Sequence, residues 1–140
     1  MLRKPSKPKK IKHISLKSLR KKAWALVSEY VRRSAANEHG IVLCFTCGKP
    51  HMWTDMDCGH YIHKDCLDYD LVNLHPQCGY CNRRLHGNRG IYAERLIAEY
   101  GEATISELRV RSEKVKKFNI TELEEIIGKY KTLLKELPNG

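Results

Sequence analysis

The sequence predicts a small α+β fold in which a short core of strands and turns lies between a basic N-terminal helix and several C-terminal helices. Three observations predict it. Apolar residues recur at helical spacing on both sides of the chain's centre. Two C-x-x-C pairs bound that centre, where short apolar runs alternate with turn residues. The length of 140 residues suits a single domain, and 30% charged residues leave it a modest core.

The first forty residues divide into an arm and a helix. Residues 1–12 hold two prolines, six Lys or Arg and three apolar residues, so we expect a disordered basic arm. A helix over residues 13–40 follows, capped by Ser15 or Ser18 and ending near Asn37 with Gly40 beyond it. Its apolar residues recur three and four apart: Leu16, Leu19, Ala23, Leu26 and Tyr30.

Positive charge is concentrated in the same segment. The chain has a net charge of +10, and residues 1–40 hold 12 Lys or Arg against 2 Glu, whereas the rest of the chain is balanced. A local basic block is typical of a surface that contacts a polyanion, although a solubilising tail has the same composition. The candidate nucleic-acid contacts here are Lys9, Lys10, Lys12, Arg20 and Lys21.

Residues 91–140 predict a helical C-terminal part of the same domain, which spans residues 13–140. Apolar spacing indicates a helix over residues 91–100, stopped by Gly101, and a second over residues 104–116. A third helix runs from Thr121 to about Glu136, because Thr121 and Glu124 have the spacing of a capping box and Pro138 ends the pattern.

The central stretch carries the spacing of a metal site. Cys44 and Cys47 form one C-x-x-C pair, and Cys78 and Cys81 form another thirty residues later. Four thiolates in tetrahedral array favour a structural zinc ion, since no position stays open for water; an iron–sulfur cluster is the alternative. The two remaining cysteines, Cys58 and Cys66, are free thiols in the simpler interpretation, or one replaces a ligand.

A polar cluster lies between and after the cysteine pairs. His60 follows a predicted strand, Asn73 precedes the second pair and Asn82 directly follows it. This order resembles the HNH, or ββα-metal, nuclease motif, in which a histidine activates water and a residue opening the next helix binds a divalent cation. The resemblance implies that His60 is the base, Asn73 the central asparagine and Asn82 a metal ligand. Residues 41–90 then form a zinc-stapled ββα-metal core.

A longer resemblance covers about residues 13–101. The strings CGHYI and NLHPQCGYCN, followed by GN and a helix ending in EYG, resemble the phage NinG/Rap recombination endonucleases. The helix with Trp24 and its Arg32-Arg33 end also matches that family, and the layout is similar to junction-resolving endonucleases of the endonuclease VII type. The resemblance implies phosphodiester hydrolysis in branched recombination intermediates such as Holliday junctions and D-loops.

One position departs from the HNH pattern. Many HNH enzymes carry Asp or His directly before the base, where this chain has Gly59, which cannot ligate. The catalytic Mg²⁺ or Mn²⁺ then needs another ligand beside Asn82. His75 is the first choice, as part of the NLHPQC string, with a catalytic role in the same site; Asp57 is second, because carboxylates suit magnesium. His86, four residues after Asn82, would share its helical face.

The remaining expectations concern DNA contacts, alternative functions, oligomeric state and cellular location. Arg83, Arg84 and Arg89 flank the proposed site and are expected to meet phosphates, or else to be solvated. A general nicking or double-strand HNH endonuclease and a non-enzymatic zinc-ribbon DNA-binding protein remain alternatives to the junction enzyme. Paired incisions on a symmetric junction would favour a homodimer. No apolar run long enough for a membrane span exists, so we expect a cytoplasmic protein, in the bacterial host cell if phage-encoded.

Overall fold

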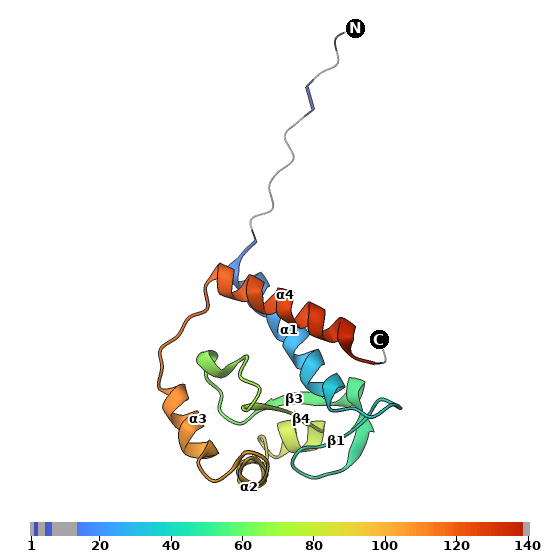
Figure 1. The fold of residues 1–140 in the computed structure, drawn as a ribbon, viewed down its shortest axis with the longest axis vertical. Helices are drawn as coiled ribbons and strands as arrows, with labels where there is room; N and C mark the ends of the chain where they lie inside the picture. The colour runs from blue at the N-terminus through green and yellow to red at the C-terminus, as the bar shows by residue number, and fades with distance from the viewer. Residues whose placement is uncertain (1, 3–4, 7–13, 139–140) are drawn as a thin grey trace.

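The structure, a computed structural model, describes residues 2, 5–6 and 14–138 (Figure 1). Most of the arm expected over residues 1–12, with Lys9, Lys10 and Lys12, lies outside the described residues. Within the described part of the chain, no helix combines the length and apolar character that a membrane span requires. The fold is a small mixed α+β arrangement, as the sequence predicted, and its described residues form two short two-stranded sheets and four α-helices.

Helix α1 (Leu16–Ser34) begins where its cap predicts. The Ser15 hydroxyl accepts a hydrogen bond from the Ser18 N–H at 3.2 Å. The helix ends at Ser34, three residues before the predicted end. Asn37 explains the early stop, because its side-chain oxygen accepts hydrogen bonds from the N–H groups of His39 and Ile41 and so shapes the turn into the first strand.

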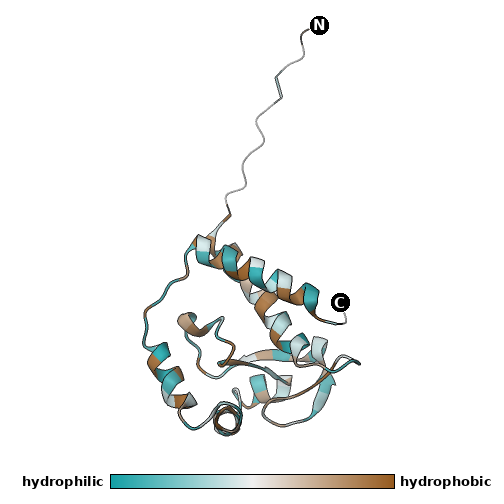
Figure 2. Ribbon diagram, viewed as in Figure 1, coloured by the Kyte–Doolittle hydropathy of each residue, from teal (hydrophilic) through white to brown (hydrophobic). Residues whose placement is uncertain are grey.

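Helix α4 (Ile120–Glu136) lies beside α1 (Figure 1). Apolar and hydrophilic residues alternate along it, as a helix with one buried face requires (Figure 2). The buried residues that join the two helices are Leu19, Ala23, Leu123 and Ile127 near their starts and Val27, Val31 and Tyr130 further along. These contacts join the first and the last helix of the described chain, which lie far apart in the sequence.

The prediction of a capping box at Thr121 is wrong, although the predicted helix is present as α4. Asn119 is the cap: its side-chain oxygen accepts a hydrogen bond from the Glu122 N–H at 2.8 Å, and the helix starts at Ile120. Asn and Thr are both good cap residues. Asn119, two residues before Thr121, has the extended backbone that a cap needs.

Two antiparallel hairpins form the centre. Strands β1 (Ile41–Leu43) and β2 (Pro50–Met52) make the first, which the sequence showed only as one apolar run. Strands β3 (Asp57–His60) and β4 (Leu74–Gln77) make the second, with Asp57 opposite Gln77 and Gly59 opposite His75. Two single 3-10 turns follow β2 and precede β4: η1 (Trp53–Asp55) and η2 (Asp65–Leu67).

The pleat of the second hairpin sorts its side chains onto two faces. Asp57 and Gly59 share one face with their cross-strand partners, whereas Cys58 and His60 point to the other. Helix α1 packs on that second face, and α2 lies across the hairpin from α1 (Figure 1). The hairpin is therefore covered on both sides, and its residues face two different environments.

The segment after β4 is less helical than predicted. The helix expected to begin at Cys81 is a single π-helical turn, η3 (Tyr80–Arg84), after which His86 and Asn88 take left-handed backbone conformations. Helix α2 (Arg89–Tyr100) begins before the predicted start at residue 91, includes Gly90, and stops at Gly101 as predicted. Helix α3 (Thr104–Ser112) is four residues shorter than its prediction.

Candidate functional site

The four paired cysteines converge as their spacing predicted. Cys44 and Cys47 lie between β1 and β2, Cys78 directly follows β4, and Cys81 lies within η3. Their four Sγ atoms are all within 4.8 Å of one another, and Cys47 Sγ is 3.8 Å from Cys78 Sγ. Tetrahedral zinc with Zn–S bonds of about 2.3 Å places sulfurs about 3.8 Å apart, so these residues fit a zinc ion.

Hydrogen bonds prepare the sulfurs for a cation. The N–H of Cys78 donates to Cys44 Sγ at 3.3 Å, and the N–H of Cys81 donates to Cys78 Sγ at 3.5 Å. Burial alone would raise the pKa of Cys44, but hydrogen bonds from Thr46 and from backbone N–H groups outweigh it and lower the pKa to about 6. Cys44 is therefore a prepared zinc ligand, whereas burial raises the pKa of Cys47 and raises that of Cys78 to about 12, so zinc binding has to displace the protons of those two thiols.

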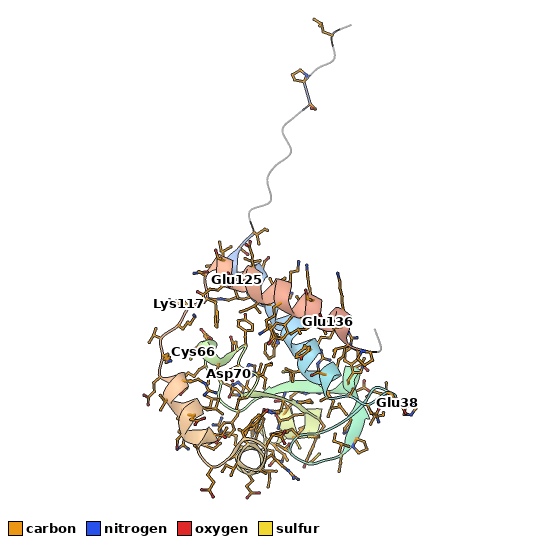
Figure 3. All side chains as sticks on the ribbon, viewed as in Figure 1. Glu38, Cys66, Asp70, Lys117, Glu125 and Glu136 are labelled. Atoms are coloured by element: carbon orange, nitrogen blue, oxygen red, sulfur yellow. The ribbon has the colours of Figure 1, made fainter. Side chains whose placement is uncertain are left out.

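The other two cysteines stay outside this cluster. Cys58 is buried against α1, and burial raises the pKa of its thiol to about 12. Cys66 is half-buried, and its sulfur contacts the backbone carbonyls of Arg111 and Ser112 at 3.4 and 3.7 Å (Figure 3). Both are free thiols with structural neighbours, in line with the simpler of the two interpretations.

Asp57 and Asn82 meet beside the cysteine cluster. The Asn82 side-chain amide donates to Asp57 Oδ2 at 3.1 Å, and Arg83 Nε donates to the same oxygen at 3.1 Å. Asp57 opens β3, and Asn82 lies in η3 next to the zinc ligand Cys81. The structure thus brings together the predicted ligand of the helix turn and a carboxylate from the hairpin.

The Gly59 position is closed to any larger residue. A Cβ atom there would collide with the side chain of Gln77, which is fully buried across the sheet. The Gln77 amide nitrogen donates to Thr46 Oγ1 at 3.2 Å and to the Gly87 carbonyl at 2.9 Å. Its Oε1 accepts no hydrogen bond from the described residues. Glycine is therefore required here because a buried amide fills the space that a ligand side chain would use.

His60 belongs to a second cluster, on the α1 side of the hairpin. Its ring stacks on Trp24 at 4.7 Å between centroids, and its Nε2 lies 3.5 Å from Asp68 Oδ1, an ion-pair distance without hydrogen-bond geometry. The His63 ring is 5.2 Å away. Burial lowers the pKa of His63, and the nearby positive charges of His60 and Arg89 lower it further.

Asn73 holds the turn that follows His60. It is fully buried, its side-chain oxygen accepts from the Ile62 N–H at 2.9 Å, and its amide nitrogen donates to the Ile62 carbonyl at 2.9 Å. The Tyr61 N–H donates to the Asn73 backbone carbonyl. This pair of side-chain bonds fixes the backbone directly after His60 in one conformation.

His75, the first-choice ligand, already has partners for both ring nitrogens. Nδ1 is 3.2 Å from the Tyr92 hydroxyl, Nε2 is 2.9 Å from the Tyr100 hydroxyl, and the ring stacks on Phe45 at 3.9 Å. Burial lowers its pKa to about 4, so the ring is neutral at neutral pH. These contacts favour a packing role and move Asp57 ahead of His75 as the ligand beside Asn82.

His86 does not share a helical face with Asn82. The expectation assumed a regular helix, but the turn ends at Arg84 and His86 has a φ of 51° on an exposed loop. The other predicted contacts are exposed and spread over the surface. Arg20 and Lys21 lie on α1, Arg84 on η3, and Arg89 places its guanidinium 5.0 Å from the centre of the Tyr61 ring.

Sequence reasoning missed three residues of this region. Asp68 lies in a loop with no motif around it, and Trp24 was named as part of the family resemblance but not as a neighbour of His60. Tyr92 donates from its buried hydroxyl to the Gly59 carbonyl at 2.8 Å and so ties α2 to β3. Its spacing four residues before the buried Leu96 is a signal that could have identified it as core, although not as a hydrogen-bond donor.

Comparison with known proteins identifies the family. The family model described as "Bacteriophage Lambda NinG protein" matches residues 2–139. The chain belongs to the NinG family. Protein ninG of Escherichia phage 933W is 30% identical over 102 residues, covering 69% of this chain and 49% of the relative. Protein ninG of Escherichia phage lambda is 29% identical over 102 residues, covering 69% of this chain and 48% of the relative.

The match to these NinG relatives is partial in length. The aligned region spans about half of each curated relative. No solved structure matches the chain. The geometry above is therefore described from this NinG-family chain alone.

The cysteine cluster predicts a specific loss of metal. In this NinG-family chain, Cys44→Ser or Cys81→Ser should release zinc and unfold the two hairpins, because zinc binding contributes folding free energy directly. Cys66→Ser, a matched change outside the cluster, should keep the metal. Elemental analysis and thermal unfolding measure both effects. Equal metal content in all three variants would contradict the site.

The buried histidine predicts how stability depends on pH. The unfolded chain takes up the His75 proton near pH 6.5, but the folded chain takes it up only near pH 4. The contribution of His75 is therefore fully present above about pH 6.5 and is lost as the pH falls to about 4, by up to about 3 kcal/mol. Denaturant titrations of wild type and His75→Gln at several pH values test it, since the mutant should lack this part of the slope.

Proposed function

We propose that this NinG-family protein is a metal-dependent DNA endonuclease of the HNH class. The observation that carries the proposal is the contact between Asp57 and Asn82 at the junction of the hairpin and η3. The metal-dependent chemistry follows from these two residues and from His60 at the other end of the same strand. The branched-DNA substrate follows from the resemblance to recombination endonucleases.

Asp57 and Asn82 offer the oxygen ligands that Mg²⁺ or Mn²⁺ prefers. Magnesium commonly takes one or two carboxylates and fills its remaining positions with water and substrate phosphate. Asn82 here turns its NH₂ group towards Asp57. A cation would need the side-chain oxygen instead, and a half-turn of the amide plane provides it without moving the backbone. Arg83, bound to the same carboxylate, adds a positive charge beside a scissile phosphate.

His60 has the surroundings of an oriented base. Asp68 lies at Nε2, where a carboxylate favours the tautomer with a proton on that nitrogen and leaves Nδ1 free to accept one. Trp24 fixes the plane of the ring. Asn73 fixes the turn that follows. An imidazole held in this way is oriented to accept a proton from the attacking water.

The separation of base and cation ligands fits an in-line displacement. Asp57 and His60 are three residues apart on an extended strand, which corresponds to about 10 Å. The attacking water and the leaving oxygen lie on opposite sides of the phosphorus, so the base and the cation that stabilises the leaving group must stand apart. Because the side chains of Asp57 and His60 project from opposite faces of β3, a DNA backbone would have to cross the edge of this strand to meet both groups.

The test is a metal titration of cleavage on a four-way junction, a D-loop and a linear duplex. His60→Ala should keep fold, zinc and DNA binding and lose roughly 100- to 10,000-fold in cleavage rate, the usual effect of removing a general base. Asn82→Ala should also lose activity but be partly rescued by higher Mg²⁺ or Mn²⁺, because it weakens cation affinity. His39→Ala is the matched control, because His39 is an exposed histidine outside the proposed site.

Two results would contradict the proposal. Wild-type rates in His60→Ala would remove the proposed base. Absence of cleavage by the zinc-loaded wild type on all three substrates, at any Mg²⁺ or Mn²⁺ concentration, would leave a zinc-containing DNA-binding protein. Cleavage of the duplex at the same rate as the junction would keep the chemistry and overturn the branched substrate.

A further inference from the structure

A cavity of about 280 Å³ lies against the cysteine cluster. Its lining comes from two parts of the chain: Lys49 and His51 from the first hairpin, and Tyr80, Leu85 and Asn88 from η3 and the turn after it. Three of the four paired cysteines, Cys47, Cys78 and Cys81, also line it, so zinc binding would fix one side of the cavity.

Tyr80 is the residue whose position is hardest to explain by packing. Its side chain is 64% exposed although it lies between the zinc ligands Cys78 and Cys81. Tyr80 also lines a second hollow, together with Gly79, Arg83 and Arg84. Arg83 Nε donates to Asp57 Oδ2. Tyr80 therefore borders both the apolar cavity and a hollow with two arginines, one of which contacts the proposed cation ligand Asp57.

These surroundings suit a flat apolar ring joined to an anionic group. Leu85 and the Tyr80 ring supply apolar surface, and Lys49, Arg83 and Arg84 supply positive charge around it. His51 and Asn88 can hydrogen-bond a polar ring edge, and His51 Nε2 has no hydrogen-bond partner among the described residues. The volume is slightly below the roughly 300–1,000 Å³ of common small-molecule pockets, so one ring system fits and a larger ligand does not.

We propose that this cavity receives one unpaired nucleobase of the DNA substrate, stacked on Tyr80, while the adjoining phosphates lie on Arg83 and Arg84. This deepens the proposed function and rests on it, because DNA is the ligand that function supplies. A base inside a continuous duplex is stacked on its neighbours and cannot enter. The cavity would therefore favour DNA with an unpaired base near the cleavage point, such as a branch, flap or gap. Stacking on an aromatic ring accepts all four bases, so no sequence preference is expected.

The experiment measures binding without cleavage. The full-length, zinc-loaded protein with His60→Ala is titrated with a flapped DNA that carries 2-aminopurine at each unpaired position in turn, beside a fully paired duplex of the same length. One position should show a fluorescence change on binding. Tyr80→Ala should abolish that change and weaken flap binding about 5- to 150-fold, whereas Tyr80→Phe should match the parent. Duplex binding should be equal in all three.

An abasic site at the responding position provides the second arm. It should weaken binding by the parent as much as Tyr80→Ala does, and the two changes together should cost no more than either alone. Equal flap affinity of Tyr80→Ala and parent would overturn the proposal, even if the protein cleaves DNA. Equal loss on flap and duplex would make Tyr80 a general contact. A change of oligomeric state in Tyr80→Ala would make the cavity an interface between two copies. Each of these results leaves the His60 and Asn82 tests untouched.

Discussion

The cluster of four cysteines joins the first hairpin to the end of the second. Cys44 and Cys47 lie between β1 and β2, Cys78 directly follows β4, and Cys81 lies within η3. Strands of three or four residues are too short to be stable alone, so a zinc ion bound by these sulfurs would stabilise their geometry. Asn82 directly follows one of these cysteines, which places its side chain at the hairpin.

Buried polar contacts hold the β3–β4 hairpin in place. Gln77 fills the space over Gly59, Tyr92 binds the Gly59 carbonyl, and Asn73 fixes the turn after His60. His75 lies in the same layer, with its two nitrogens turned towards tyrosine hydroxyls. The polar residues of this layer therefore position strand β3, with Asp57 and His60 at its two ends. In the proposed endonuclease only these two residues and Asn82 would act on DNA, and the other histidines and amides of the stretch would hold the strand in place.

The sequence predicted the elements that depend on local pattern. Helix α1, the stop at Gly101, the mixed α+β class and the meeting of the four cysteines follow from periodicity, glycine and spacing, and the structure has them. The sequence-based prediction failed where two local structures fitted the same residues equally well. Asn119 rather than Thr121 caps α4, and the π-helical turn at Tyr80 replaced a regular helix, which removed His86 from the site. The contacts of Asp57, Asp68 and His75 depend on which residue lies across the sheet or loop, and a single sequence carries no signal for that.

The central claim is that one protein scaffold holds two metals, zinc among four thiolates and a magnesium-like cation between Asp57 and Asn82. Crystals of the zinc-loaded protein soaked in Mn²⁺, with anomalous difference maps recorded on both sides of the zinc and manganese absorption edges, test it most directly. We predict a zinc peak at the centre of Cys44, Cys47, Cys78 and Cys81 and a manganese peak within ligand distance of Asp57 and Asn82. A manganese peak at His75 or His86 instead, or none near Asp57 in crystals that retain zinc, would contradict the account.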